Sequence, residues 1–337
     1  MTIRVGLIGY GVAGQFFHAP LIHATPGLRL AAVVTNNPER AAEVEREYGA
    51  RAVPGDVESL CDLVVIASPN RTHVPLAKRA LEAGKAVVVD KPLARTAEQA
   101  QELVDLARDR DLMLTVFQNR RWDGDFLTLR RLVADEALGD VLRFESRFER
   151  WRPEPKGGWR ESGGADEVGG LLYDLGSHLV DQAIQLLGPV AHVYAESDVR
   201  RAGVESDDDS FIALTHVSGA RSHLWVSAMA AQLGPRFRVL GSRAAYVKYG
   251  LDVQEEQLRA GIDPAAPGFG DDPEERWGVL GDDTVATERG AYLDFYRAIA
   301  EGRTPVDPNS VVEALTVIEA ARRSAEEGTV RVVTPRR

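Results

Sequence analysis

Two side chains that could exchange protons with a substrate lie four residues apart in the second half of the chain. Asp174 and His178 fall in a stretch, 171–187, whose apolar residues recur with helical spacing, so the two would share one helix face. Histidine is the side chain best suited to accept a hydroxyl proton near neutral pH. The carboxylate could orient the imidazole, stabilise its charge or bind a substrate hydroxyl. Taken alone, such a pair is more often a helix-surface pair with no role.

A lysine stands at the end of an apolar segment in the first half of the chain. Lys91 follows the strand candidate Ala86–Val89 and Asp90, and it precedes Pro92. Proline holds the preceding residue in an extended conformation, and the bond between them can be cis. An ammonium group at this strand end would stabilise negative charge developing on a substrate oxygen. The alternative interpretation is a solvated surface lysine.

A glycine pattern comes directly after the first predicted strand and opens a helix. It reads Gly9-Tyr10-Gly11-Val12-Ala13-Gly14. In this context the pattern is the dinucleotide-binding fingerprint, in which the first glycine allows a tight turn. Gly11 lets backbone amides approach a pyrophosphate, Gly14 lets the helix pack close to the strand, and the helix N-terminus attracts the phosphates. The alternative is a glycine-rich turn without a ligand.

The end of the second predicted strand indicates which dinucleotide is bound. Sites for NAD place a carboxylate there to hold the ribose 2′-hydroxyl, and this strand has none at its tip. Thr35 and Asn36 can donate hydrogen bonds to a 2′-phosphate, and Arg40 can reach it with a charged fork. Glu39 is one helical step from Arg40 and would point away from that phosphate. The alternative for Arg40 is a position on a solvated helix face. The sequence therefore predicts NADP rather than NAD.

The elements around these residues alternate between strands and helices, which predicts a parallel sheet covered on both faces in a doubly wound Rossmann domain. The predicted strands are Ile3–Ile8, Leu28–Val34, Leu63–Ala67, Ala86–Val89 and Met113–Phe117, and the predicted helices are Pro38–Tyr48, His73–Ala83 and Ala97–Arg110. Ligands of such sheets lie outside the carboxyl ends of the strands. We therefore expect further cofactor contacts from the residues at two strand ends, namely Ser68, Pro69, Asn70, His73, Asp90 and Lys91.

The pattern changes after residue 120. Two predicted hairpins, 211–227 around Ser218-Gly219 and 237–248 around Gly241-Ser242, indicate a large, mainly antiparallel sheet in an α+β domain. We predict an NADP-binding domain over residues 1–120 and a domain for substrate binding and oligomerisation over residues 121–337.

Composition limits the classes of function. The 337 residues carry a net charge of −11, which argues against a nucleic-acid partner. The chain has a single cysteine, Cys61, at the start of an apolar stretch, which is typical of a reducing compartment. It shows no signal peptide and no apolar run long enough to span a membrane. These features predict a soluble cytoplasmic protein. The histidines and the cysteine show no metal-ligand spacing, and the acidic clusters 207–209 and 271–275 are interpreted as solvated loops, so no metal is expected.

These motifs, taken in order, resemble the Gfo/Idh/MocA oxidoreductase family, in which a GxGxxG is followed by Glu-Lys-Pro and then by Asp-x-x-x-His. The chain is most similar to its bacterial NADP-dependent scyllo-inositol dehydrogenases, and Asp90 stands where the wider family has Glu. The resemblance covers nearly the whole chain and rests on the stretches IRVGLIGYGVAGQFFHAPLI, VVVDKPL, FQNRRWDGDFLTLRRL, YDLGSHLVDQAI and GSRAAYVKYGLDVQEEQL.

The resemblance implies a hydride transfer between NADP and a cyclitol, scyllo-inositol or its keto form, with a sugar or anhydro-sugar as the alternative substrate. It implies that Lys91, Asp174 and His178 are catalytic, and their presence argues against a non-catalytic NADP-sensing regulator. It also implies a homodimer or homotetramer formed through the second domain's sheet. Further residues are expected near the nicotinamide or substrate by family position: Asn119, Arg120, Trp159, Arg160 and Tyr292, together with Gly169-Gly170, whose backbone would approach the nicotinamide.

Overall fold

The computed structural model describes residues 2–155, 157 and 169–333, which form two compact units. The N-terminal unit comprises Met1–Asp123, Val253–Gly270 and Gly290–Val311, and the C-terminal unit comprises Gly124–Asp252, Asp271–Arg289 and Val312–Arg337. Two segments from the last third of the chain therefore fold with the first third. The division of cofactor and substrate binding between residues 1–120 and 121–337 stays a prediction.

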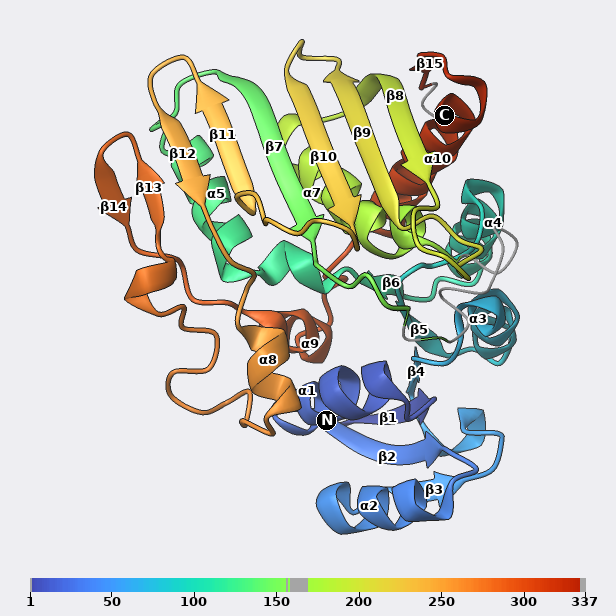
Figure 1. The fold of residues 1–337 in the computed structure, drawn as a ribbon. Helices are drawn as coiled ribbons and strands as arrows, with labels where there is room; N and C mark the ends of the chain where they lie inside the picture. Colours follow the sequence, from blue (N-terminus) through green and yellow to red (C-terminus); the bar gives the residue numbers. More distant parts are fainter. Residues whose placement is uncertain (1, 156, 158–168, 334–337) are drawn as a thin grey trace. The chain divides into compact units, whose positions relative to one another are not determined.

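The N-terminal unit is built on a parallel six-stranded sheet (Figure 1). In spatial order its strands are β3 (Arg51–Val53), β2 (Leu28–Val34), β1 (Ile3–Ile8), β4 (Leu63–Ile66), β5 (Ala86–Asp90) and β6 (Leu114–Phe117). This is the Rossmann order, and it confirms the predicted doubly wound sheet. β1 pairs with β2 on one side and β4 on the other, so the carboxyl ends of β1 and β4 lie at the point where the strand order reverses. The short β3 was not predicted.

The helices of this unit are η1 (Gly14–His18, a π-helix), α1 (Ala19–His23), α2 (Pro38–Tyr48), α3 (His73–Glu82), α4 (Ala97–Asp109), α8 (Gln254–Arg259) and α9 (Tyr292–Ala300), with short 3-10 turns η2 (Glu58–Leu60), η3 (Asn70–Thr72) and η4 (Asn119–Trp122). Two of them, α2 and α4, begin at residues whose side chains cap them. Asn37 caps α2 by accepting from the Arg40 amide at 3.0 Å, and Thr96 caps α4. α2 ends at Gly49, whose φ is +59°.

Aromatic packing explains why α9 folds with the first third of the chain. The Phe295 ring centroid lies 5.0 Å from that of Phe117 at the end of β6. The Thr115 hydroxyl on β6 donates to the Val306 carbonyl at 2.9 Å, which ties the segment after α9 to the same strand.

The C-terminal unit contains a nine-stranded sheet, and α5 (Gly124–Ala134), α7 (Ser177–Leu187) and α10 (Pro308–Glu327) lie on one face of it (Figure 1). Its strands in spatial order are β14 (Asp283–Val285), β13 (Gly278–Leu280), β12 (Ala245–Lys248), β11 (Phe237–Gly241), β7 (Val141–Glu149), β10 (Arg221–Ser227), β9 (Asp209–His216), β8 (Val190–Asp198) and β15 (Arg331–Val332). Only β7 and β10 pair in parallel, which confirms a mainly antiparallel sheet and both predicted hairpins. A π-helix η6 (Leu172–Gly176) precedes α7, and a 3-10 turn η7 (Glu274–Arg276) precedes β13.

Each acidic cluster that was predicted to be a solvated loop contains a buried carboxylate, whereas Asp271, Glu274 and Glu275 are exposed as predicted. Asp208 is 1% exposed, and Arg201 donates to it at 2.8 Å. The Asp272 side chain is 5% exposed and lies 2.7 Å from the buried ammonium of Lys248. Each carboxylate is buried because a buried cation pairs with it.

No helix among residues 2–155 and 169–333 has both the length and the apolar character needed to cross a bilayer. Within the same residues, no group of three or more His, Cys, Asp or Glu side chains is arranged to hold a metal ion.

Candidate active site

The glycine turn after β1 packs so closely that two of its positions admit no side chain. Gly9 has φ +100°, and a Cβ there would lie 2.6 Å from the carbonyl oxygen of Ala67 at the end of β4. A Cβ on Gly14 would lie 2.1 Å from the carbonyl oxygen of Gly9. A Cβ on Gly11 would meet no described atom within 4 Å. The turn is therefore tight on its inner side and open at Gly11, which fits a pyrophosphate held by backbone amides.

Tyr10, predicted to contact the cofactor, has an inward-facing side chain. Tyr10 is 2% exposed, and its hydroxyl donates to Glu43 on α2 at 2.9 Å. Gln15 donates to the same carboxylate at 2.9 Å. Burial, together with Tyr48 and Glu43, raises the pKa of Tyr10 well above its ordinary value. A contact with a cofactor is therefore open to the backbone of Tyr10, whereas the side chain of Val12 is 53% exposed.

Gly14→Ala and Gly11→Ala should separate folding from cofactor binding. The Gly14→Ala side chain collides with backbone, and overpacking of this kind typically costs about 1–3 kcal/mol of unfolding free energy. Gly11→Ala meets open space and should unfold like the wild type, yet bind the predicted dinucleotide more weakly, because its methyl group would block the pyrophosphate. Urea unfolding and NADPH fluorescence titration measure the two effects. Wild-type affinity in Gly11→Ala would contradict the assignment of this turn to the cofactor.

The end of β2 presents polar groups beside the first turn of α2. Asn36 and Arg40 are exposed, and the Thr35 hydroxyl accepts from the Asn37 amide at 3.3 Å. Glu39 is also exposed in that first turn. The helix N-terminus and the Arg40 guanidinium together favour an anionic group at this position.

His73, another predicted cofactor contact, ties two strand ends together instead of facing open space. Its side chain is buried, with Nδ1 2.7 Å from the Pro92 carbonyl oxygen and Nε2 2.8 Å from the Ser68 carbonyl oxygen. His73 therefore joins the segment after β4 to the segment after β5, where the Lys91–Pro92 peptide bond is cis. The side chain of His73 therefore holds the backbone beside Lys91 in place.

The carboxylate of Asp90 is held by groups that the sequence did not predict. It accepts from the Lys91 amide at 3.0 Å and lies 3.8 Å from Nε2 of the fully buried His18. The other ring nitrogen of His18 lies 2.6 Å from the Tyr296 hydroxyl. Burial opposes ionisation, but His18, followed by His73 and Lys91, lowers the pKa of Asp90 below its ordinary value. Asp90 therefore stays ionised beside Lys91 at neutral pH.

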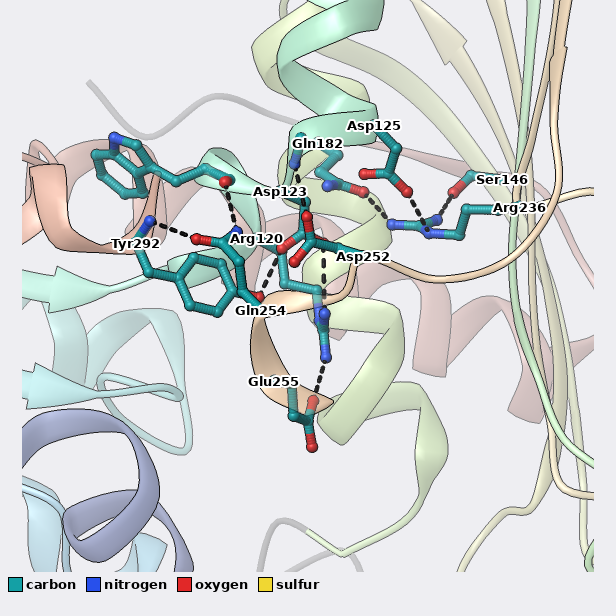
Figure 2. Close-up of polar contacts among 12 residues, drawn as sticks. Arg120, Asp123, Asp125, Ser146, Gln182, Arg236, Asp252, Gln254, Glu255 and Tyr292 are labelled. Atoms are coloured by element: carbon teal, nitrogen blue, oxygen red, sulfur yellow. Dashed lines mark hydrogen bonds and ion pairs between the residues drawn. The ribbon is translucent and has the colours of Figure 1, made fainter. Parts of the chain in front are cut away.

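A buried network brings two predicted residues, Arg120 and Tyr292, to the same carboxylate (Figure 2). The Arg120 guanidinium lies 3.3 Å from Asp123 and 2.8 Å from Glu255 on α8. The Tyr292 hydroxyl donates to the other oxygen of Asp123 at 2.7 Å. Burial would raise the pKa of Glu255, but Arg120 and Arg259 lower it. Asn119, also predicted, is 7% exposed beside this network.

Asp174 and His178 lie on one continuous helix of the C-terminal unit. Asp174 belongs to η6, and His178 is the second residue of α7. His178 is 5% exposed, and the apolar residues after it pack into the core of the sheet. The helical spacing predicted for residues 171–187 is confirmed, although its first turn is a π-helix.

A buried arginine anchors this helix one turn beyond His178 (Figure 2). Arg236 directly precedes β11 and is 3% exposed. Its guanidinium donates to the Gln182 side chain at 2.8 Å and to Ser146 on β7. Asp125 lies 3.8 Å from the same guanidinium. Gln182 and His178 are four residues apart, so this contact helps to set the rotation of α7 about its axis.

The structure thus gathers the predicted residues into two groups. The glycine turn, the β2 end, Lys91, the Arg120 network and Tyr292 belong to the N-terminal unit, whereas Asp174 and His178 belong to the C-terminal unit. Trp159 and Arg160 lie outside the described residues.

Both parts of the chain match known protein families. Residues 3–118 match the oxidoreductase family with an NAD-binding Rossmann fold, and residues 126–247 match the GFO/IDH/MocA C-terminal domain.

Individual relatives match over nearly their whole length. The oxidoreductase YdgJ of Escherichia coli, itself uncharacterized, is 42% identical, with 96% of this chain and 97% of YdgJ covered. IolW of Bacillus subtilis, named scyllo-inositol 2-dehydrogenase (NADP(+)), is 33% identical, with coverages of 97% and 94%. The structure of YvaA from Bacillus subtilis superposes with a TM-score of 0.92 at 33% identity and covers 99% of each chain. The chain therefore belongs to the Gfo/Idh/MocA oxidoreductase family and is a dehydrogenase that acts on CH–OH groups.

Proposed function

We propose that the protein is an NADP-dependent dehydrogenase of cyclitols that interconverts scyllo-inositol and its keto form. The observation that carries this proposal is the full-length similarity to IolW, whose name specifies both that substrate and NADP. The candidate catalytic residues Lys91, Asp174 and His178, at the positions that the family motifs specify, support it further.

In the proposed reaction, the protein moves one proton and stabilises one developing charge. NADP+, when bound, supplies the hydride acceptor. His178 accepts the proton of the reacting hydroxyl, and Asp174 orients the imidazole or holds a neighbouring substrate hydroxyl. The Lys91 ammonium stabilises the negative charge that develops on the substrate oxygen as its carbon loses hydride. In the reverse direction, His178 returns the proton to the oxygen of the ketone.

The proposed preference for NADP rests on the end of β2. The first turn of α2 offers amides and the Arg40 guanidinium, and no carboxylate stands at Thr35 or Asn36 to repel a 2′-phosphate. The glycine turn would hold the pyrophosphate, and the backbone at Ser68, Pro69 and Asn70 would lie along the cofactor.

Arg40→Ala should raise KM for NADP+ by about 10–100-fold, the cost of losing a charge-assisted hydrogen bond. KM for NAD+ should change little, because NAD+ carries no 2′-phosphate. Arg46→Ala removes an equally exposed arginine from the last turn of the same helix and serves as the matched control. An unchanged KM for NADP+ in Arg40→Ala would remove this residue from the phosphate site.

The experiment that tests the function is nicotinamide absorbance with a panel of inositols and sugars, run separately with NADP+ and NAD+. Turnover of scyllo-inositol with NADP+ and little with NAD+ is the expected result. Turnover of an aldose or anhydro-sugar alone would replace the cyclitol with a sugar. Cofactor binding without any turnover would favour an NADP-sensing regulator.

We further propose a cytoplasmic homodimer or homotetramer. The face of the nine-stranded sheet opposite α5, α7 and α10 supports this, because it carries stacked aromatic and cationic side chains suited to a subunit contact. On this face, the Arg147 guanidinium lies 3.9 Å from the ring centroid of Trp225, which lies 5.1 Å from that of Phe211.

A further inference from the structure

The helix that carries Asp174 and His178 begins against a carboxylate from a distant loop. Asp207 stands just before β9, and its Oδ2 accepts from the Leu172 amide at 2.7 Å. The Asp207 carbonyl oxygen accepts from the neighbouring Leu171 amide at 2.9 Å. The first amides of a helix have no partner within the helix, so Asp207 supplies acceptors for two of them.

A glycine makes room for this carboxylate. Gly170 has φ +89°, and a Cβ there would lie 1.9 Å from Oδ1 of Asp207. The Gly170 carbonyl oxygen in turn accepts from the Asp174 amide at 3.1 Å. Asp207, Gly170 and Asp174 are therefore linked through consecutive contacts within the C-terminal unit, which gives Gly170 a role other than approach to the nicotinamide.

Asp207 is itself held firmly. The Ser210 hydroxyl donates to its Oδ2 at 3.1 Å. The adjacent Asp208 accepts from the Arg200 amide at 2.7 Å and from the Arg201 guanidinium at 2.8 Å, which fixes the loop between β8 and β9. The loop therefore presents the Asp207 carboxylate in a defined position.

We propose that Asp207 is a positioning residue of the active site, whose carboxylate fixes the first turn of the helix that places Asp174 and His178. The proposal rests on the catalytic roles proposed above for those two residues. A carboxylate at a helix N-terminus satisfies free amides and interacts favourably with the helix dipole. Loss of this contact lets the first turn shift, and displacements of about 1 Å in catalytic geometry can cost 10²-fold in rate.

The test compares Asp207→Ala and Asp207→Asn with the matched control Asp209→Asn, which removes a charge two residues away on β9. Asp207→Ala should lower kcat by about 10-fold or more. Asp207→Asn should lower it by only a few-fold, because its amide oxygen still accepts from Leu172. The NADPH dissociation constant should stay unchanged in both, and Asp209→Asn should behave like the wild type. Hydrogen exchange of residues 170–178 should accelerate in Asp207→Ala.

Wild-type kcat and exchange in a fully folded Asp207→Ala protein would overturn the proposal. If Asp207→Ala does not fold, Asp207→Asn decides: a few-fold loss of kcat with faster exchange supports the proposal, and wild-type values overturn it. If the wild type turns over no polyol or sugar, the proposed function fails separately. Exchange measured without substrate then decides whether Asp207 fixes the helix.

Discussion

Replacing His178 with alanine should lower kcat by about 10²–10⁴-fold, the usual contribution of a positioned general acid or base. The hydroxyl proton then has no acceptor, whereas the groups proposed to hold the cofactor lie in the N-terminal unit and are untouched. NADPH affinity should therefore be unchanged. Steady-state kinetics with the best substrate of the panel, together with an NADPH titration, measure both quantities.

Two comparisons make this result specific to His178. His192→Ala removes an exposed histidine from β8 in the same unit and should leave kcat near the wild-type value. Added imidazole should restore part of the activity of His178→Ala, because it replaces the missing base. Near-normal turnover in His178→Ala would show that another group takes the proton.

Lys91→Met should lower kcat by about 10²–10³-fold, the effect of removing one group that stabilises a developing oxyanion. Methionine keeps most of the length and apolar stem of lysine, so the loss reports the ammonium charge. Steady-state kinetics in both reaction directions should show the same fold loss in kcat/KM, because both directions share one transition state.

Lys85→Met is the matched control. Lys85 stands before the opposite end of β5 and donates to the Cys61 carbonyl at 3.0 Å, so its loss affects a structural hydrogen bond only. Equal kcat in Lys91→Met and Lys85→Met would remove Lys91 from the reaction.

The features that the sequence predicted well are local ones. The glycine turn, the helix from residue 38 to residue 48 and the helical spacing around His178 are each encoded within about a dozen residues. The hairpins were equally visible, because each has its turn residues between two short strands.

The contacts that hold the site are distant along the chain, and spacing rules do not reach them. His18 and Tyr296 are 278 residues apart, and Arg120 and Glu255 are 135 apart. Asp208 and Asp272 were predicted to be solvated because Arg201 and Lys248 were not recognised as their buried partners. The π-helical turn at Asp174 was also missed, since it changes the backbone without changing the apolar pattern.

The alternation of the chain between its two units has a consequence for dissecting the protein. The chain crosses from one unit to the other after residues 123, 252, 270, 289 and 311, so no single cut separates them. A fragment that stops at residue 123 lacks Glu255 and Tyr296 and leaves the Phe117 ring without its cover. A cofactor-binding fragment that folds on its own therefore requires residues 253–270 and 290–311 joined to its end. For the same reason, a chimera that combines the N-terminal half of one relative with the C-terminal half of another would divide the core of each unit.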